Sequence, residues 1–296
     1  MSDRSGETLL AVDAPIKLEE RPTTRLTYQR RRPPVEGYSP VLTPENALLH
    51  ELSVGRLRLE ARGGAFKGTT NNREMILHIL VGQCTIEARG TWGRATLRNL
   101  GERRDVFSGS PTAVVLGPFT EYTVVPTTRA LDVAVGSLPL DEDPGRPPTV
   151  IRPQDVQVHH VGERHFARTV REVLGGEGPA VRLRAGETIN PEGLWSSWPH
   201  HEFDANPDLA PLFEEVFLYF TKPGRGWAVQ KREGLFCTNE PIDDVLIVHN
   251  GDAGVMPLGN HPIVAGVDSQ VLYVWFYVSP IPKIYAHWAE DIGGYS

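Results

Sequence analysis

The sequence predicts an all-β protein built from two similar blocks of short strands, and three observations favour this. Among its 296 residues are 29 Gly and 25 Pro, many of them between short apolar runs. Regularly spaced short strands with such turn residues are typical of β-sandwiches and barrels. A similar order of strands and turns occurs before residue 139 and again after residue 178, which suggests an internal duplication. The length fits two domains of about 100–150 residues each.

The chain divides into four segments. Residues 1–44 are polar with scattered Pro and Arg, and we interpret them as an arm that pairs with the other half or with a second subunit. Residues 45–138 form the first predicted barrel and residues 179–296 the second. Residues 139–178 are predicted to be a linker, because the Pro-rich run 141–148 can form neither a central strand nor a helix.

Strands are expected wherever apolar residues alternate with polar ones or form short buried runs. Leu52–Glu60 alternates, and Met75–Val81 is a continuous apolar run that Gly82 ends. Further strands are expected at 84–89, 112–116, 122–125 and 130–135 in the first block and at 180–183, 216–220, 227–232, 245–248 and 271–278 in the second.

One helix is predicted, at residues 165–174. Its apolar residues recur at i, i+4, i+7 and i+8, beginning at Phe166, which is a helical spacing. The pair Gly175-Gly176 would end it.

Composition excludes several classes of protein. A net charge of −7 argues against a nucleic-acid partner. No run of about 18 apolar residues is present, so no membrane span is expected. The start of the chain lacks the apolar core of a signal peptide. Cys84 and Cys237 have no CxxC spacing and are interpreted as reduced thiols, which predicts a cytoplasmic protein.

Candidate metal ligands lie in the second block. His201 follows an aromatic and proline-containing stretch, Glu215 stands at the head of an aromatic strand, and His261 follows a turn. A β-barrel can bring such strands together. Imidazole and carboxylate suit a divalent metal such as Zn, Mn, Fe or Ni. The first block has no comparable set of His and Glu and is predicted to be structural and metal-free, with His78 in the core or lining the barrel.

The second block also contains a series of short motifs. They are W-S-S-W-P at 195–199, Glu214-Glu-Val216, Gly226–Gln230, Asp243-Asp244, Gly251-Asp252 and P-L-G-N-H-P at 257–262. Together they closely resemble the 5-deoxyglucuronate isomerases of inositol catabolism, which are related to the 4-deoxy-uronate isomerases of pectin breakdown. The resemblance covers about residues 45–280.

The resemblance implies two tandem cupin barrels, a bicupin, with the metal site in the second. It implies an aldose–ketose isomerase that converts 5-deoxy-glucuronate to 5-dehydro-2-deoxy-gluconate. His201, Glu215 and His261 would be metal ligands, and Gln230 and Lys231 would be catalytic residues that orient the oxygens or the carboxylate of the sugar acid. No nucleotide-binding loop is visible, so no organic cofactor is expected.

Position 203 departs from the family pattern. Members have a second histidine two residues after the one matched by His201, and here that residue is Phe203, which cannot bind a metal. A register shifted by one residue would instead place His200 and Glu202 on one face. Two functions therefore compete: an active isomerase, and a non-catalytic or redirected cupin that binds a sugar acid. A homo-oligomer, in the first place a dimer, is also expected, because the edge strands of such barrels need cover.

Overall fold

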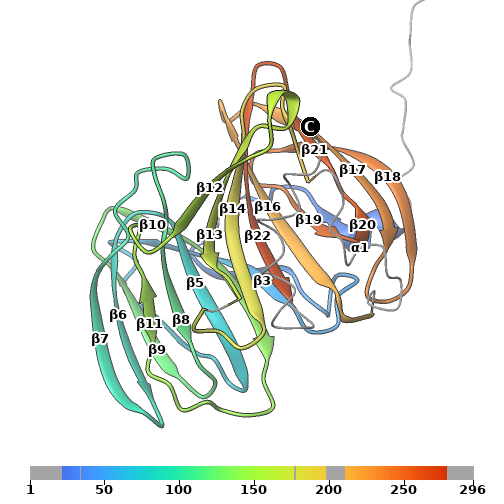
Figure 1. Cartoon of the computed structure of the whole chain (residues 1–296). Coiled ribbons are helices and arrows are strands. Elements are labelled where there is room, and N and C mark those ends of the chain that lie inside the picture. The colour runs from blue at the N-terminus through green and yellow to red at the C-terminus, as the bar shows by residue number, and fades with distance from the viewer. Residues whose placement is uncertain (1–21, 34, 177, 198–210, 279–296) are drawn as a thin grey trace, which may run out of the picture.

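The chain forms two β-barrels that pack against each other through their larger sheets (Figure 1). The structure is a computed structural model that describes residues 22–33, 35–176, 178–197 and 211–278. In these ranges the only helices are α1 (Pro22–Thr27) and a short 3-10 turn, η1 (Arg164–Phe166). No helix of the described ranges is long and apolar enough to cross a membrane. The all-β, two-barrel prediction is confirmed.

The first barrel consists of a six-stranded sheet, in the order β11-β8-β5-β10-β3-β2, and a four-stranded sheet, in the order β4-β9-β6-β7. Its strands are β2 (Gly37–Leu42), β3 (Ser53–Glu60), β4 (Phe66–Thr69), β5 (Arg73–Val81), β6 (Cys84–Gly90), β7 (Gly93–Leu100), β8 (Thr112–Leu116), β9 (Glu121–Pro126), β10 (Ala130–Pro139) and β11 (Thr149–Ile151).

The second barrel consists of a seven-stranded sheet, in the order β1-β19-β16-β22-β14-β13-β12, and a smaller sheet, in the order β15-β21-β17-β18 with β20 beside β17. Its strands are β1 (Tyr28–Gln29), β12 (Gln157–Val161), β13 (Arg168–Leu174), β14 (Leu183–Asn190), β15 (Trp195–Ser196), β16 (Glu214–Lys222), β17 (Trp227–Leu235), β18 (Pro241–His249), β19 (Ala253–Met256), β20 (Leu258–Asn260), β21 (Ile263–Ala265) and β22 (Gln270–Val278).

The two barrels share one topology, apart from β12 and β20, which have no counterpart in the described part of the first barrel. In the large sheets β8, β5, β10 and β3 occupy the places of β19, β16, β22 and β14, and the small sheets correspond in the same way. The short strands β1 and β11 are exchanged between the barrels. Strand β1 precedes the first barrel in the chain but pairs with β19 of the second. Strand β11 precedes the second barrel in the chain but pairs with β8 of the first. The predicted arm therefore contributes a strand to the other half of the chain.

Strand alternation gives each large sheet two buried faces. Along β5, Leu77 and Ile79 pack inside the first barrel, whereas Ile76 and Leu80 face the second domain. Along β16, Phe217 lies inside the second barrel and the residues on either side of it face the first domain. The four sheets thus stack in four layers with a shared apolar core between the two large ones, and β6–β7 and β17–β18 lie at opposite ends of the molecule (Figure 1).

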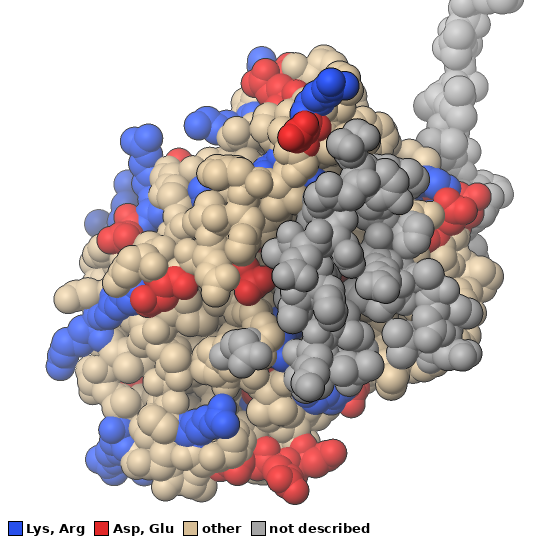
Figure 2. Space-filling view, in the orientation of Figure 1, with Lys and Arg blue, Asp and Glu red and all other residues tan. Residues whose placement is uncertain are grey.

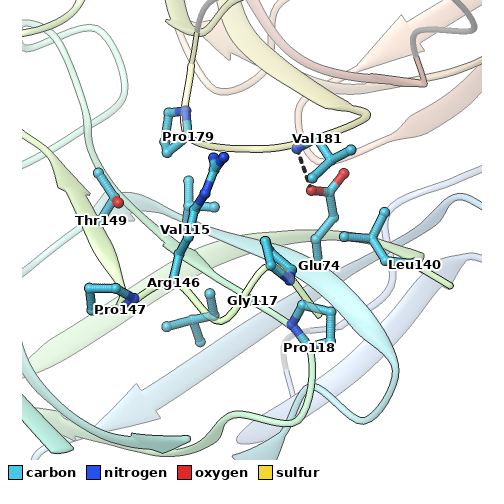
Figure 3. Close-up of a pocket in the computed structure, with 12 residues that line it drawn as sticks. Glu74, Val115, Gly117, Pro118, Leu140, Arg146, Pro147, Thr149, Pro179 and Val181 are labelled. Atoms are coloured by element: carbon cyan, nitrogen blue, oxygen red, sulfur yellow. Dashed lines mark hydrogen bonds between the residues drawn. The ribbon is translucent and has the colours of Figure 1, made fainter. Parts of the chain in front are cut away.

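Two buried glutamates at equivalent positions join the domains reciprocally. Glu74 at the start of β5 accepts hydrogen bonds from the backbone N–H groups of residues 181–183, at 2.6–2.8 Å, where β14 begins. Figure 3 shows the bond from Val181. Glu214 at the start of β16 accepts bonds from the N–H groups of residues 50–52, at 3.0–3.1 Å, just before β3. These bonds satisfy backbone donors that the sheets leave unpaired at the domain boundary.

A fully buried ionic cluster occupies the middle of the shared core. The carboxylate of Glu187 in β14 contacts Nε2 of His78 at 2.8 Å, Nη2 of Arg103 at 2.5 Å and Nη1 of Arg171 at 3.1 Å. Burial alone would raise the pKa of Glu187, but the guanidinium of Arg103 and the hydrogen bond from His78 outweigh it and lower this pKa to about 2. Burial in turn lowers the pKa of His78.

The helix predicted at 165–174 is wrong, because those residues form η1 and strand β13. Strand β13 pairs with β12 and β14 along its length. Two long-range constraints override the helical spacing: Val170 packs inside the second barrel, and Arg171 on the opposite face pairs with Glu187. We therefore propose that the second domain begins near residue 157, within the segment predicted to be a linker.

Glu187→Gln should lower the free energy of unfolding by about 3–5 kcal/mol, because it leaves two buried guanidinium groups without a counter-charge. Chemical denaturation measures this, with Glu121→Gln in the exposed Arg89–Glu121 pair as a control that should change little. Since the pKa of Glu187 is depressed, its contribution in the parent should persist above pH 4.5 and disappear as the pH falls toward about 2. Equal stability of the two variants would contradict the role of the cluster.

Candidate functional site

The interior of the second barrel is lined by aromatic side chains. They come from the inward faces of β16 and β22, where Phe217 and Tyr273 stack with their ring centroids 4.4 Å apart. Tyr273 accepts or donates hydrogen bonds with Ser196 at 2.9 Å and Ser197 at 3.2 Å. The W-S-S motif thus fixes an aromatic wall of the barrel, and polar groups inside it are enclosed by apolar surface.

Two predicted metal ligands, Glu215 and His261, meet inside this barrel. Glu215 is the second residue of β16 and lies opposite Tyr277 in β22. His261 stands between β20 and β21, in the turn that follows Gly259. Gly259 has φ +130°, and a side chain there would clash with the backbone of Glu233, so the turn requires glycine. Nε2 of His261 lies 3.5 Å from Oε2 of Glu215, and both residues are buried.

The donor pair suits a divalent metal. Zinc binds nitrogen and oxygen donors at about 2.0–2.2 Å, so two donors at a tetrahedral angle lie about 3.4 Å apart. The separation of the two atoms here is 3.5 Å. The ring of Phe217 packs edge-on against the His261 imidazole, with centroids 5.9 Å apart. The imidazole and the carboxylate are therefore held at a separation that one ion can bridge.

Gln230, a predicted catalytic residue, is fully buried beneath His261. Its amide nitrogen donates hydrogen bonds to the backbone carbonyls of His261 at 2.6 Å and Pro262 at 3.2 Å, and its amide oxygen accepts one from Tyr219 at 3.1 Å. Those contacts occupy the amide group and fix the backbone that bears the imidazole. Gln230 thus holds the backbone of His261 and Pro262 in place.

Lys231, the other predicted catalytic residue, is not brought to this site. Successive residues of a strand point to opposite faces, and Lys231 faces outward from β17 while its neighbour Gln230 faces in. Its ammonium forms ion pairs with Asp243 and Glu233. The hydrogen bond to Asp243 raises its pKa.

The third predicted ligand, His201, lies outside the described residues. So do Phe203 and the alternative pair His200 and Glu202. Both registers of that stretch therefore stay predictions.

The first barrel has no carboxylate at the position that corresponds to Glu215. Glu214 and Glu74 are equivalent, so the counterpart of Glu215 in the first barrel is Met75, which packs into that barrel's apolar core. The counterparts of Phe217 and Tyr219 are likewise apolar. The described part of the first barrel thus has an apolar residue where the second has a carboxylate.

A second group of donors that could hold a metal ion lies at the domain boundary. Atoms of His50, Glu214 and Cys237 are within 4.8 Å of one another. The carboxylate of Glu214 already accepts three backbone hydrogen bonds, and the Cys237 thiol donates to the carbonyl of Leu48 at 3.5 Å. Burial raises the pKa of Cys237 to about 12, so the thiol stays protonated, whereas metals bind the thiolate. These contacts indicate that the three residues connect the two domains and do not bind a metal.

The chain is similar to known proteins over most of its length. The chain is 28% identical over 263 residues to the 5-deoxy-glucuronate isomerase of Geobacillus kaustophilus, covering 87% of this chain and 90% of that one. It is 28% identical over 262 residues to the enzyme of the same name from Geobacillus thermodenitrificans, covering 87% and 91%.

Among solved structures, an IolB-like protein from Salmonella typhimurium LT2 superposes with a TM-score of 0.73 at 23% identity, covering 87% of this chain and 94% of that one. The oxalate decarboxylase of Lactobacillus farciminis superposes with a TM-score of 0.61 at 11% identity, covering 86% of each chain. These likenesses show the two-barrel cupin fold. The family model of the KduI/IolB proteins matches residues 31–293, and the chain belongs to the KduI/IolB family.

Proposed function

We propose that this protein is an aldose–ketose isomerase that converts 5-deoxy-glucuronate to 5-dehydro-2-deoxy-gluconate in inositol catabolism. The observation that carries the proposal is the buried pair of Glu215 and His261, held 3.5 Å apart inside an aromatic barrel. The family membership and the names of the relatives favour an isomerase over the alternative, a cupin that binds a sugar acid without converting it.

The chemistry moves a proton from the carbon beside an aldehyde to the aldehyde carbon. A divalent metal, Zn, Mn, Fe or Ni, would act as a Lewis acid that stabilises the negative charge developing on the two adjacent substrate oxygens. Glu215 and His261, with His201 as the third predicted ligand, would hold it. Gln230 fixes the backbone of His261, and the aromatic walls exclude water from the charged groups.

The surface charge does not favour a nucleic-acid partner. The net charge of the chain is −7. On the face seen in Figure 2, acidic and basic side chains are interspersed, without a large patch of one sign. We also place the protein in the cytoplasm, because Cys84 and Cys237 are both buried and unpaired in the structure.

A homo-oligomer, in the first place a dimer, is part of the proposal. Strand β18 is at the edge of its sheet, and the outward face of this strand presents Val245 and Ile247, which are 59% and 51% exposed. An exposed apolar edge strand invites pairing with another chain. Size-exclusion chromatography with light scattering at low micromolar concentration should give a species larger than 32.8 kDa, and a monomer throughout would contradict it.

His261→Ala should abolish both metal retention and isomerase activity, because it removes one of the two donors that meet inside the barrel. The protein is purified without added metal or chelator, its metal content is measured by mass spectrometry, and ketose formation from 5-deoxy-glucuronate is followed. Lys231→Met is the control: this residue was also predicted to be catalytic, but it faces outward and pairs with Asp243 and Glu233, so the activity of the variant should stay within about threefold of the parent.

The comparison has two contrary outcomes. If His261→Ala keeps the metal and the activity of the parent, the site is elsewhere. If the parent binds metal through His261 but converts no aldose, the non-catalytic alternative replaces the isomerase.

Phe203→His should raise metal affinity, since it would add the donor that the family pattern has at this position. Each further imidazole donor replaces a solvent ligand, so a gain of at least about tenfold is expected, the size of effect known for changes near metal sites. Calorimetric metal titration of parent and variant measures it, and isomerase activity should rise in parallel. An unchanged affinity would show that residue 203 does not face the site and would favour the His200/Glu202 register.

A further inference from the structure

A buried cation lies on the inward wall of the second barrel, in the same row of side chains as Glu215. Arg184 in β14 is opposite Tyr277 in β22, and Tyr277 is in turn opposite Glu215 in β16. Residues directly opposite each other in antiparallel strands point to the same face. Arg184 is only 1% exposed, so its charge is enclosed within the barrel wall.

Arg184 differs from the other buried arginines of the described residues in its partners. The other four, Arg56, Arg103, Arg171 and Arg232, each form an ion pair with an aspartate or a glutamate. Arg184 forms none. Its guanidinium contacts the backbone carbonyl of Leu183 at 2.9 Å and two further carbonyls at 3.4–3.5 Å, and its Nε has no hydrogen-bond partner. Carbonyl dipoles satisfy some N–H groups but leave the positive charge without a counter-ion.

The carboxyl group of Glu172 does not act as a counter-ion for Arg184. Glu172 in β13 interacts with Arg184 electrostatically, but the two form no ion pair. Burial raises the pKa of Glu172 despite the charges of His159 and Arg184, whereas a carboxylate paired with a guanidinium would have a lowered pKa. The charge of Arg184 thus remains available for an anion.

The first barrel also has an arginine in this row, but it comes from another strand and is bound differently. By the correspondence of β3 with β14, and of Glu214 with Glu74, the residue of the first barrel that matches Arg184 is Ser53. The guanidinium of Arg73 in β5 donates hydrogen bonds to the hydroxyls of Ser53 at 2.9 Å and Ser137 at 3.1 Å. Arg73 thus has side-chain partners, whereas the hydrogen bonds of Arg184 described above all go to backbone carbonyls.

Its separation from the ligand pair suits a sugar acid. Neighbouring strands are about 4.8 Å apart, so the Cα atoms of Arg184 and Glu215, two strands apart, are about 10 Å from each other. The first and sixth carbons of an extended six-carbon acid are about 6 Å apart, given bonds of about 1.5 Å. Arg184 and Glu215 project from the same face of the sheet, so a molecule of this length that lies along the row can meet both side chains.

We propose that Arg184 binds the carboxylate of the substrate, with the acid end of the sugar acid at Arg184 and its carbonyl end at Glu215 and His261; this inference rests on the function proposed above. A guanidinium matches a carboxylate with two parallel hydrogen bonds, and the two long carbonyl contacts of Arg184 are the ones to be exchanged. Arg184 would thus select uronic acids against neutral aldoses.

The test compares two probes that differ in one group, D-glucuronate and D-glucose. Calorimetry measures their binding to the full-length metal-loaded parent, to Arg184→Met and to Arg182→Met. The last is the matched control, because Arg182 lies two residues away and pairs with Glu51 of the first domain. The parent should prefer glucuronate, Arg182→Met should keep that preference, and Arg184→Met should reduce it by a factor of about 30 or more. Arg184→Lys should retain part of it.

Denaturation of the same variants separates binding from a structural role. Removing a buried charge that has no counter-ion should leave the unfolding midpoint of Arg184→Met unchanged or raise it. If that variant fails to fold, Arg184→Gln and Arg184→Lys provide the same comparison. The inference is overturned if the parent does not prefer glucuronate, or if the preference survives without a cation at residue 184. An Arg184-dependent preference in a protein without isomerase activity would instead refute the proposed function and leave this inference standing.

Discussion

The packing of the two large sheets on each other is the constraint on which the rest of the structure depends. This packing buries the outer faces of β5, β10, β16 and β22, so each of these strands is buried on both sides. A charge buried in an apolar core is costly unless it is paired. Glu187 is compensated from both domains, by His78 and Arg103 of the first and Arg171 of the second. This cluster and the reciprocal bonds of Glu74 and Glu214 define one relative placement of the barrels.

The two barrels have the same topology but differ at a few inward-facing positions. Both barrels pack a large sheet against the other domain. Among the described residues, Met75 in the first barrel corresponds to Glu215 in the second, and Ser53 corresponds to Arg184. The first barrel contributes its outer sheet face and its exchanged strand, while the inward face of the second carries the Glu215–His261 pair and Arg184.

Much of this architecture is predictable from the sequence, because strand alternation and glycine-rich turns are local signals. The strand at 271–278 and the pairing of Glu215 with His261 in one barrel both follow from such signals together with the family resemblance. The failures have non-local causes. The residues of β13 have helical spacing, but they become a strand because Arg171 must reach Glu187. Lys231 is next to Gln230 in the chain but faces outward, because successive side chains of a strand point to opposite faces. Arg184 stands in an ordinary strand pattern, and only the missing counter-charge singles it out.

The central claim is that the Glu215–His261 pair in the second barrel holds a divalent metal. Anomalous diffraction from crystals of the protein, collected on both sides of the absorption edge of the metal found in it, tests this most directly. The account predicts one strong peak inside the second barrel, about 2.0–2.2 Å from both Oε2 of Glu215 and Nε2 of His261. A peak located instead among His50, Glu214 and Cys237, or no peak inside the second barrel of a protein that is active as an isomerase, would contradict it.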